Sequence, residues 1–444
     1  MTADRLATAS KDGYLYGYAP VVLARTRAMT VPFVRVNRLF HQNGLSNPSS
    51  RSVVAPNVDT LYSLAWLDLR FGPAMLSIPD SPGRYRVFQF LDVWTNTFAN
   101  VGTRTTGDRA GRFAIVPPGW GEALAHDVTV IPAPSWDVWM VGRTLVHGPG
   151  DLAAARQVQR HYALEIISSD IRDTPPRLPA VPYKERRSPQ APGDAGAAFF
   201  DELAAILAAN PPPPADAPLL ARLADLGILD GAARRTADAA RVTAGITAGE
   251  QVITAAEVSA TGWVGNFEVG AYGTDYTTRA ILARRGLGAN VPDESLYYYC
   301  RTDGEGRPLT GTRHYRLSFP AGALPPCAHE GFWSLTMYDE NMFMVPNELR
   351  RYAVGDRSDH LALSSDGSLD LYLRATASPH HEPNWLPAPS GPFAVVLRVY
   401  LPTWPLHSLE AALSQEAALS QEAALSQEAA PSREAWPPTI EALP

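Results

Sequence analysis

The chain has 444 residues, of which 45% are hydrophobic and 19% are charged, and its formal net charge is −7. This length predicts two or three domains, and the composition is typical of a globular protein rather than a disordered one. The 38 lysines and arginines form no basic block, which argues against a nucleic-acid partner. The two cysteines, Cys300 and Cys327, exclude a disulfide framework, although one bridge between them stays open.

Targeting signals are also missing from the sequence. The N-terminus lacks the charged and then apolar pattern of an export signal. No window of about 18 consecutive apolar residues occurs, so no membrane span is expected. These features predict a cytoplasmic protein.

Residues 1–150 predict an N-terminal β domain. Residues 11–30 carry apolar side chains at helical spacing and predict a helix that covers a sheet. After them, short apolar runs alternate with turn sequences, which is typical of an antiparallel sandwich or barrel. The predicted strands are 60–70, 84–93, 97–103, 112–116, 127–132 and 137–146.

The rest of the chain divides into three regions. Residues 151–291 show helical spacing broken by proline-rich linkers and predict a helical insert. Residues 292–404 return to strands separated by turns. The predicted fold class is therefore mainly β with an α insert: two antiparallel, jelly-roll-like β-sandwich domains joined by a helical block.

Residues 405–444 form a tail with a repeat of six residues. Copies of the sequence EAALSQ start at Glu410, Glu416 and Glu422. Six residues turn an α-helix through about 600°, so successive leucines advance by about 240° and no apolar stripe forms. The tail is therefore expected to be a solvated helix or disordered, without a catalytic role.

Two stretches place polar groups inside apolar runs. The first is 56–63, with Asn57, Asp59 and Tyr62, and the second is 332–341. Because a buried polar group without a partner costs about 1–3 kcal/mol, such groups need partners. We expect the two stretches to face one pocket.

These motifs resemble two bacterial families. The sequences NVDTLYS (57–63), WLDL (66–69), FLDVWTN (90–96) and GTRTTG (102–107) resemble the domain of unknown function numbered 1254. The sequences PLTG (308–311), FWSLTMYD (332–339), DGSL (366–369) and NWLPAP (384–389) resemble its usual companion, number 1214. The resemblance covers about residues 11–404.

The resemblance implies an architecture rather than a settled reaction. It implies two β-sandwich-like domains around a helical insert, often as a homo-oligomer, with a homodimer as the candidate assembly. Many relatives carry an export signal that this sequence lacks, so the periplasmic location common among them is not expected here.

Asp59 and Asp92 are the carboxylates expected to be enclosed, because apolar or aromatic residues flank each of them. Burial raises the pKa of a carboxyl group, which would let one act as a general acid while the other stays ionised. The alternative is structural: each carboxylate would bond backbone groups or pair with Arg104 or Arg143.

The expected lining of the pocket is aromatic with a few polar points, which suits a small apolar metabolite. Core packing of the aromatic rings and turn-holding by the amides are equally open. The candidate substrate-binding residues are Trp94, Asn96, Trp333, Tyr338, Asn384 and Trp385.

No metal and no cofactor are predicted. His380, His381 and Glu382 are the one local metal candidate, but adjacent histidines point in different directions on most backbones. Sequence motifs for a nucleophile elbow, a phosphate-binding loop and a dinucleotide fold are missing.

The sequence therefore predicts a cofactor-independent enzyme that acts by acid–base chemistry on a small hydrophobic or carbonyl-bearing metabolite. A lyase, cyclase, isomerase or hydrolase step, in secondary metabolism for example, fits this description. Asp59 is the expected acid or base, with Tyr62 and Asn57 as orienting groups, Asp92 as second carboxylate and Arg104 as a clamp.

The alternative is a non-catalytic binding protein for a lipid or small hydrophobic ligand. Enclosed carboxylates with separated pKa values would favour the enzyme. Carboxylates that are both in ion pairs would favour the binding protein.

Overall fold

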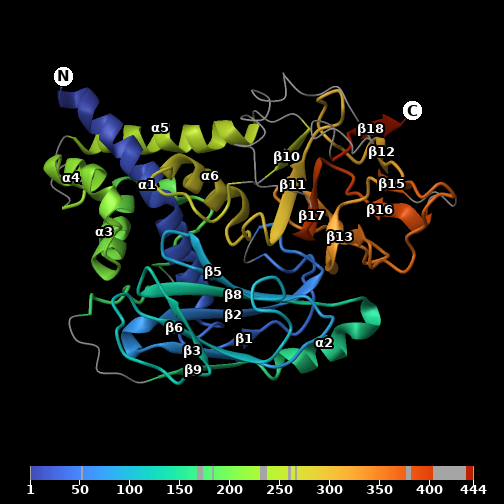
Figure 1. Cartoon of the computed structure of the whole chain (residues 1–444). Helices are drawn as coiled ribbons and strands as arrows, with labels where there is room; N and C mark the ends of the chain where they lie inside the picture. Colours follow the sequence, from blue (N-terminus) through green and yellow to red (C-terminus); the bar gives the residue numbers. More distant parts are fainter. Residues whose placement is uncertain are drawn as a thin grey trace, which may run out of the picture. The chain divides into compact units, whose positions relative to one another are not determined.

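The structure is a computed structural model, and it describes residues 2–51, 54–167, 174–182, 185–230, 238–258, 262–265, 268–376, 382–403 and 437–443. The chain forms two compact units (Figure 1). The first comprises Met1–Leu45, Thr60–Ser259 and Glu268–Asn290, and the second comprises Ser46–Asp59, Ala260–Phe267 and Val291–Pro444. Four sheets and several helices make it a mixed α/β protein, with one pair of sheets in each unit.

The first unit contains a five-stranded sheet of order β1-β2-β8-β4-β5 and a four-stranded sheet of order β7-β6-β3-β9. All six strands predicted for this region are present within two residues of their expected ends. The strands are β1 Phe40–His41, β2 Thr60–Asp68, β3 Ala74–Ile78, β4 Arg86–Leu91, β5 Thr97–Gly102, β6 Gly111–Val116, β7 Val128–Pro132, β8 Asp137–Leu145 and β9 Ala163–Ile166.

The two sheets of the first unit share one apolar core. Leu67, Phe90 and Met140 from the five-stranded sheet pack in the same cluster as Leu76 and Ile115 from the other. Strand β8 is buried at all nine positions. It is the central strand of its sheet and is covered on both faces, including its polar residues Asp137, Arg143 and Thr144.

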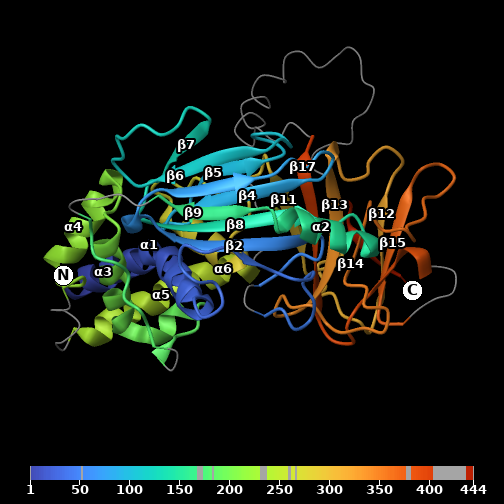
Figure 2. The same ribbon diagram turned by 90° about the horizontal axis from the view of Figure 1, so that it is seen from below.

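Helices pack beside these sheets in the first unit, where α1, α3, α4 and α5 lie together in both views (Figure 2). The helical segments predicted between residues 151 and 291 do not form a unit of their own. Those from 199 onward pack around α1, which is buried over most of its length. The helices are α1 Thr2–Thr30, α2 Leu152–Gln159, α3 Phe199–Ala209, α4 Ala217–Asp225, α5 Ala239–Val258 and α6 Tyr276–Gly286.

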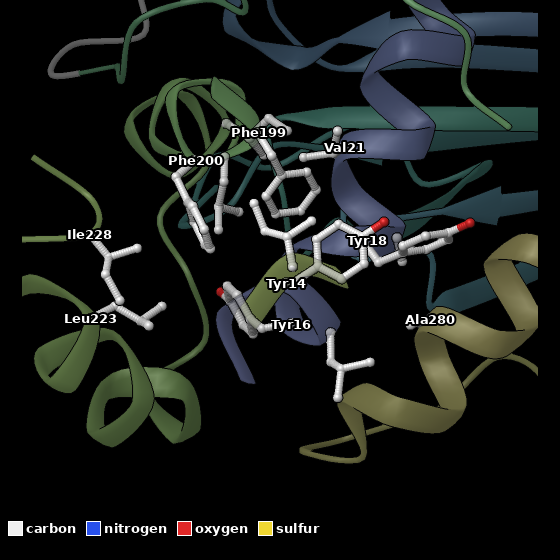
Figure 3. Packing of buried hydrophobic residues seen from close by; sticks show 14 of the residues in the cluster. Tyr14, Tyr16, Tyr18, Val21, Phe199, Phe200, Leu223, Ile228 and Ala280 are labelled. Carbon is white, nitrogen blue, oxygen red and sulfur yellow. The ribbon is translucent and has the colours of Figure 1, made fainter. Parts of the chain in front are cut away.

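Close packing around α1 depends on small and aromatic side chains. Tyr14 and Tyr18 lie with Phe199 and Phe200 in one apolar cluster (Figure 3). A Cβ atom on Gly17 would come within 2.8 Å of Leu203. Gly17 therefore lets α3 approach α1 closely, at the usual cost of a glycine inside a helix.

The second unit contains a five-stranded sheet of order β10-β11-β17-β13-β14 and a four-stranded sheet of order β16-β15-β12-β18. Leu335 and Leu397 of the first sheet share a core with Leu317 and Leu371 of the second. The strands are β10 Trp263–Gly265, β11 Ser295–Cys300, β12 His314–Phe319, β13 Cys327–Asp339, β14 Ala353–Gly355, β15 Leu369–Arg374, β16 Trp385–Pro387, β17 Phe393–Pro402 and β18 Ile440–Leu443.

The expectation of purely antiparallel sheets is wrong at two places. Strand β6 pairs with β7 in parallel, and β15 pairs with β16 in parallel. A tight hairpin can only join antiparallel neighbours, whereas a longer connection returns the chain to the starting end of the sheet. The connection 117–127 does so between β6 and β7, and turn residues alone did not reveal its path.

The end of the chain contributes a strand that the sequence did not predict. Strand β18 pairs with β12 and places Ile440 in the core of the second unit. The Trp263 indole donates to the Pro438 carbonyl oxygen at 2.8 Å. The predicted tail of 405–444 thus ends in a structural element, while its repeats lie outside the described residues.

Ile440→Ala is expected to lower the free energy of unfolding of the second unit by about 2–4 kcal/mol, because it removes a fully buried side chain. Urea unfolding of the full chain measures this loss. Glu441→Ala on the same strand is the control. It breaks only an exposed ion pair with Arg316 and should cost at most about 1 kcal/mol. Equal losses would contradict a core role for β18.

No helix among the described residues has the length and apolarity needed to cross a membrane.

Candidate functional site

The structure places the two predicted carboxylates in different units. Asp59 lies in the second unit with Asn57, whereas Asp92 lies in the first unit with Tyr62. Both aspartates are buried, as expected, with exposed fractions of 5% and 3%. Their surroundings differ in a way that separates their chemistry.

Asp59 is held on both carboxylate oxygens. The Ser334 hydroxyl donates to Oδ2 at 2.7 Å, and the Arg357 guanidinium donates to Oδ1 at 2.7 Å. The backbone N–H of Asp59 donates to Asn57 Oδ1 at 3.0 Å. Residues 56–59 and 332–341 therefore do meet, and the Tyr338 hydroxyl donates to the Pro56 carbonyl oxygen as well. This set of bonds is typical of a structural carboxylate.

Asp92 closes the turn between β4 and β5. Its Oδ1 accepts from the Asn96 backbone N–H at 2.8 Å, and its Oδ2 accepts from the Asn96 side-chain amide at 2.9 Å. Thr95 has a φ of 67°, so the turn passes through the left-handed region. Burial raises the pKa of Asp92 to about 6, although hydrogen bonds from Asn96 oppose this shift.

Arg279 of α6 lies in the same part of the first unit and is only 2% exposed. Its guanidinium carbon is 5.2 Å from the ring centre of Tyr16, 5.1 Å from that of Tyr276 and 5.8 Å from that of Trp94. These distances are those of cation–π contacts, which help to offset the loss of hydration. Arg279 Nη2 donates to the Tyr16 carbonyl oxygen at 2.8 Å.

Four buried polar atoms in this part of the first unit make no hydrogen bond of standard geometry with a described residue, although the Tyr16 hydroxyl lies close enough to Asp216 to interact with its carboxylate. They are Arg279 Nε, the Tyr16 hydroxyl, Thr95 Oγ1 and Asp216 Oδ2. The other Asp216 oxygen accepts from the Tyr276 hydroxyl at 2.7 Å. Each buried polar atom without a partner costs about 1–3 kcal/mol. A ligand with both donors and acceptors would recover this free energy, so the concentration of such atoms marks a candidate site.

We call this group the Asp92 cluster, and three of its members lie at its outer side. Asn96, Tyr272 and Tyr276 are half-buried, while the others are buried. The Tyr272 backbone N–H donates to Asn96 Oδ1 at 3.2 Å and ties the 268–275 loop to the turn. Burial raises the pKa values of Tyr272 and Tyr276 to about 12, so both phenols stay protonated at neutral pH. The cluster comprises Tyr16, Asp92, Trp94, Thr95, Asn96, Asp216, Tyr272, Tyr276 and Arg279.

Some predicted site residues have structural surroundings instead. Asn384 accepts from the Ala362 backbone N–H and donates to the Ala362 carbonyl oxygen, so it holds a turn. The Trp385 indole donates to the Arg374 carbonyl oxygen. Trp333 is packed in the core of the second unit.

Arg104 and Tyr62 are predicted site residues of the first unit that do not belong to the Asp92 cluster. Arg104 is exposed in the turn after β5, and its role as a clamp stays a prediction. Tyr62 is half-buried, with the Arg143 guanidinium 5.8 Å from its ring centre. Arg143 itself donates to Gln89 and to the Gly288 carbonyl oxygen.

The sequence analysis did not single out five members of the cluster, Tyr16, Asp216, Tyr272, Tyr276 and Arg279. Tyr272 belongs to the 268–275 loop, and the other four are contributed by α1, α6 and the short 3₁₀ segment Pro214–Asp216. Each of these four sits in a predicted helical region, whose apolar spacing draws attention to the core. The one available signal was Pro20 inside the predicted helix.

The metal candidate cannot be placed, because His380, His381 and the Glu382 side chain lie outside the described residues. Within the described part of the chain, no three histidine, cysteine or acidic side chains are grouped so that they could hold a metal ion.

Comparison with one solved structure supports the fold. A crystal structure of the VPA0106 protein from Vibrio parahaemolyticus has a TM-score of 0.67 at 22% identity, and the match covers 91% of this chain and 97% of that one. An uncharacterized protein from Burkholderia cenocepacia has a TM-score of 0.45 at 13% identity, with 90% and 92% covered. No curated protein gives a significant match.

Family comparison identifies both regions of the chain. Residues 36–165 match the model described as "Protein of unknown function (DUF1254)", and residues 294–404 match "Protein of unknown function (DUF1214)". The resemblance found from the motifs is thereby confirmed. The chain is a two-domain protein with a DUF1254 region followed by a DUF1214 region.

Proposed function

We propose that the protein is a cofactor-independent enzyme. Its Asp92 cluster would bind a small hydrophobic or carbonyl-bearing metabolite and transfer a proton to or from it. The observation that carries this proposal is the placement of two buried groups near each other: Asp92, whose pKa burial raises to about 6, and Arg279, whose Nε–H has no hydrogen-bond partner among the described residues. A pKa near the working pH suits a group that must both accept and release a proton.

The roles follow from the charges in the cluster. Asp92 is largely ionised at neutral pH and acts as the base toward a C–H next to a carbonyl group. Negative charge then develops on the carbonyl oxygen, where Arg279 Nε donates a hydrogen bond. The rings of Trp94, Tyr16 and Tyr276 exclude water from the reacting centre. Lyase, cyclisation and isomerisation steps can each begin with such a proton transfer.

Asp59 receives a different role in this proposal. Both carboxylates accept hydrogen bonds, but Asp59 is also in an ion pair with Arg357, which a proton transfer would first have to break. We therefore propose that Asp59 and Asn57 hold residues 56–59 within the second unit, and that Asp92 is the acid–base group.

The test is exchange of carbon-bound hydrogen in D₂O. Cyclohexanone, phenylacetone and acetophenone serve as probes, and ¹H NMR follows the loss of the signal next to the carbonyl group. Wild-type protein should accelerate exchange of at least one probe, and Asp92→Asn should reduce the protein-catalysed rate by about 100-fold or more.

Two variants serve as controls for this experiment. Asp127→Asn, on an exposed loop position, should leave the rate unchanged. Asp59→Asn should also retain it if the protein stays folded by circular dichroism. Loss of exchange in Asp59→Asn with retention in Asp92→Asn would transfer the acid–base role to Asp59 and refute the proposal.

The second candidate function is non-catalytic binding of a lipid or small hydrophobic ligand. The ion pair of Asp59 with Arg357 favours it, because one of the two enclosed carboxylates is unavailable for chemistry. Native mass spectrometry of freshly purified protein distinguishes the two functions. A stoichiometric ligand that survives purification unchanged, together with no exchange of any probe, would favour binding.

Several finer expectations stay predictions. They are the jelly-roll character of the two sheet pairs, a homodimeric assembly and a place in secondary metabolism.

A further inference from the structure

Helix α1 contains a proline where most helices would have a hydrogen-bond donor. Pro20 lies inside Thr2–Thr30 and has no backbone N–H. The carbonyl oxygen four residues earlier belongs to Tyr16, which therefore lacks its usual helical partner. Both residues are buried. A buried carbonyl group without a donor is costly, so Tyr16 needs a donor from elsewhere.

Arg279 supplies that donor. Its Nη2 donates to the Tyr16 carbonyl oxygen at 2.8 Å, although 263 residues separate the two in sequence. The guanidinium group is planar and its N–H directions are fixed relative to one another. Once Nη2 is bonded to α1 and three aromatic rings surround the group, the direction of the Nε–H is fixed too.

We infer that Pro20 is a positioning residue of the Asp92 cluster: it frees the Tyr16 carbonyl oxygen to hold Arg279, whose Nε–H is thereby presented to an oxygen acceptor on the ligand. The ligand class is a compound with a carbonyl or carboxylate oxygen next to an apolar body. This inference rests on the proposed function for the identity of the site, but the link between Pro20 and Arg279 can be tested alone.

A purely structural role for Pro20 makes a different prediction. If the proline only bends α1, its replacement changes stability and leaves the Arg279 guanidinium as it was. If Pro20 positions Arg279, replacement by alanine restores an N–H that competes for the Tyr16 carbonyl oxygen. Alanine is the best helix former, so the variant is expected to fold.

The experiment compares Pro20→Ala with the wild-type full chain by NMR after labelling the arginines with ¹⁵N. Arg279→Lys identifies the Arg279 signals by their loss. Pro32→Ala is the matched control, since Pro32 is exposed just after α1, where the last four carbonyl groups of the helix have no intrahelical partner in any case. In Pro20→Ala the Arg279 guanidinium protons should exchange with water about five- to tenfold faster, as expected for the loss of one hydrogen bond.

Two further measurements should change in Pro20→Ala only if Pro20 positions Arg279, and not if the proline merely shapes the helix. The ¹³C titration midpoint of Asp92 should move upward in Pro20→Ala, because the Arg279 charge that lowers its pKa becomes less well placed. Addition of acetophenone should shift the Arg279 Nε–H signal in wild type and shift it less in Pro20→Ala. Pro32→Ala should match wild type in both measurements.

Unchanged Arg279 exchange and an unchanged Asp92 midpoint in Pro20→Ala would overturn the inference. An acetophenone shift that does not involve Arg279 Nε–H would overturn the assigned ligand class. Failure of the proposed function looks different: no probe would exchange hydrogen in the wild type, yet Arg279 would still respond to Pro20→Ala. If the wild type exchanges the carbon-bound hydrogen of a probe but the Arg279 signals do not change in Pro20→Ala, the positioning role alone is refuted.

Discussion

Asp137→Ala is expected to lower the free energy of unfolding of the first unit by about 3–5 kcal/mol, because it leaves buried charges without their partner. Asp137 Oδ1 accepts from Arg27 of α1, and Oδ2 accepts from Arg70 at 2.9 Å. The Asn210 side chain donates to the same Oδ2 at 2.8 Å. One carboxylate therefore ties α1, the central strand β8 and the end of α3 together.

The buried position of Arg70 makes this loss large. Its side chain is 2% exposed, and Asp68 is its other carboxylate partner at 3.0 Å. Urea unfolding at pH 7 measures the effect. Asp127→Ala is the matched control, because it breaks an aspartate–arginine pair in which both side chains are about half exposed, and it should cost at most about 1 kcal/mol. A loss in Asp137→Ala no larger than in Asp127→Ala would contradict the network.

The pH dependence of this network has a definite sign. Burial raises the pKa of Asp137, but the charges of Arg27 and Arg70 outweigh it and hold the pKa below its usual value. The native state thus binds this proton less readily than the unfolded state, whose aspartates titrate near about 3.9. The stabilisation is present above that pH and is lost as the pH falls through the lower native value.

The strands of the first unit were largely predictable from turn residues and apolar runs. The apolar run 138–141 marks β8, and β4 begins just after the turn sequence PDSPG (79–83). Strand β3 was missed because Ala74–Ile78 is short and lies between two turn sequences. The parallel partner of β6 depends on the path of the 117–127 connection, which local sequence does not specify.

The candidate site was predictable only in part, and for a physical reason. Asp92, Trp94 and Asn96 lie in one turn, so their clustering is visible in the sequence. Arg279 and Tyr16 become neighbours only when α6 packs on α1, and this contact is a property of the tertiary fold. A proline within a predicted helix does reveal that one carbonyl group needs a distant donor.

The two networks have opposite effects on stability at neutral pH. Asp137 has guanidinium partners that favour its charged form, whereas burial disfavours the charged form of Asp92. A carboxyl group that is costly to ionise in the native state is expected where charge serves function rather than folding. Replacing it with a neutral isostere should therefore relieve a cost.

Asp92→Asn is accordingly expected to gain stability relative to wild type as the pH rises. The native pKa of about 6 exceeds the unfolded value near about 3.9, so the native state binds more protons between these values. The contribution of Asp92 to the stability of the wild type is thus highest at a pH below the pKa of the unfolded state, and it falls as the pH rises through the pKa of the native state. The difference in unfolding free energy between Asp92→Asn and wild type should increase by about 2 kcal/mol from pH 4.5 to pH 7.5.

Urea unfolding followed by circular dichroism at several pH values measures this difference. The Asp92→Asn substitution could weaken the hydrogen bond from the Asn96 side-chain amide. Because neither amide titrates, this loss would shift the plot of the free-energy difference against pH by a constant amount and leave its slope unchanged. Asp127→Asn should give a nearly flat curve over the same range, since its carboxylate is exposed. A flat curve for Asp92→Asn would mean that its carboxyl group titrates as in an unfolded chain, and the acid–base role of the cluster would lose its physical basis.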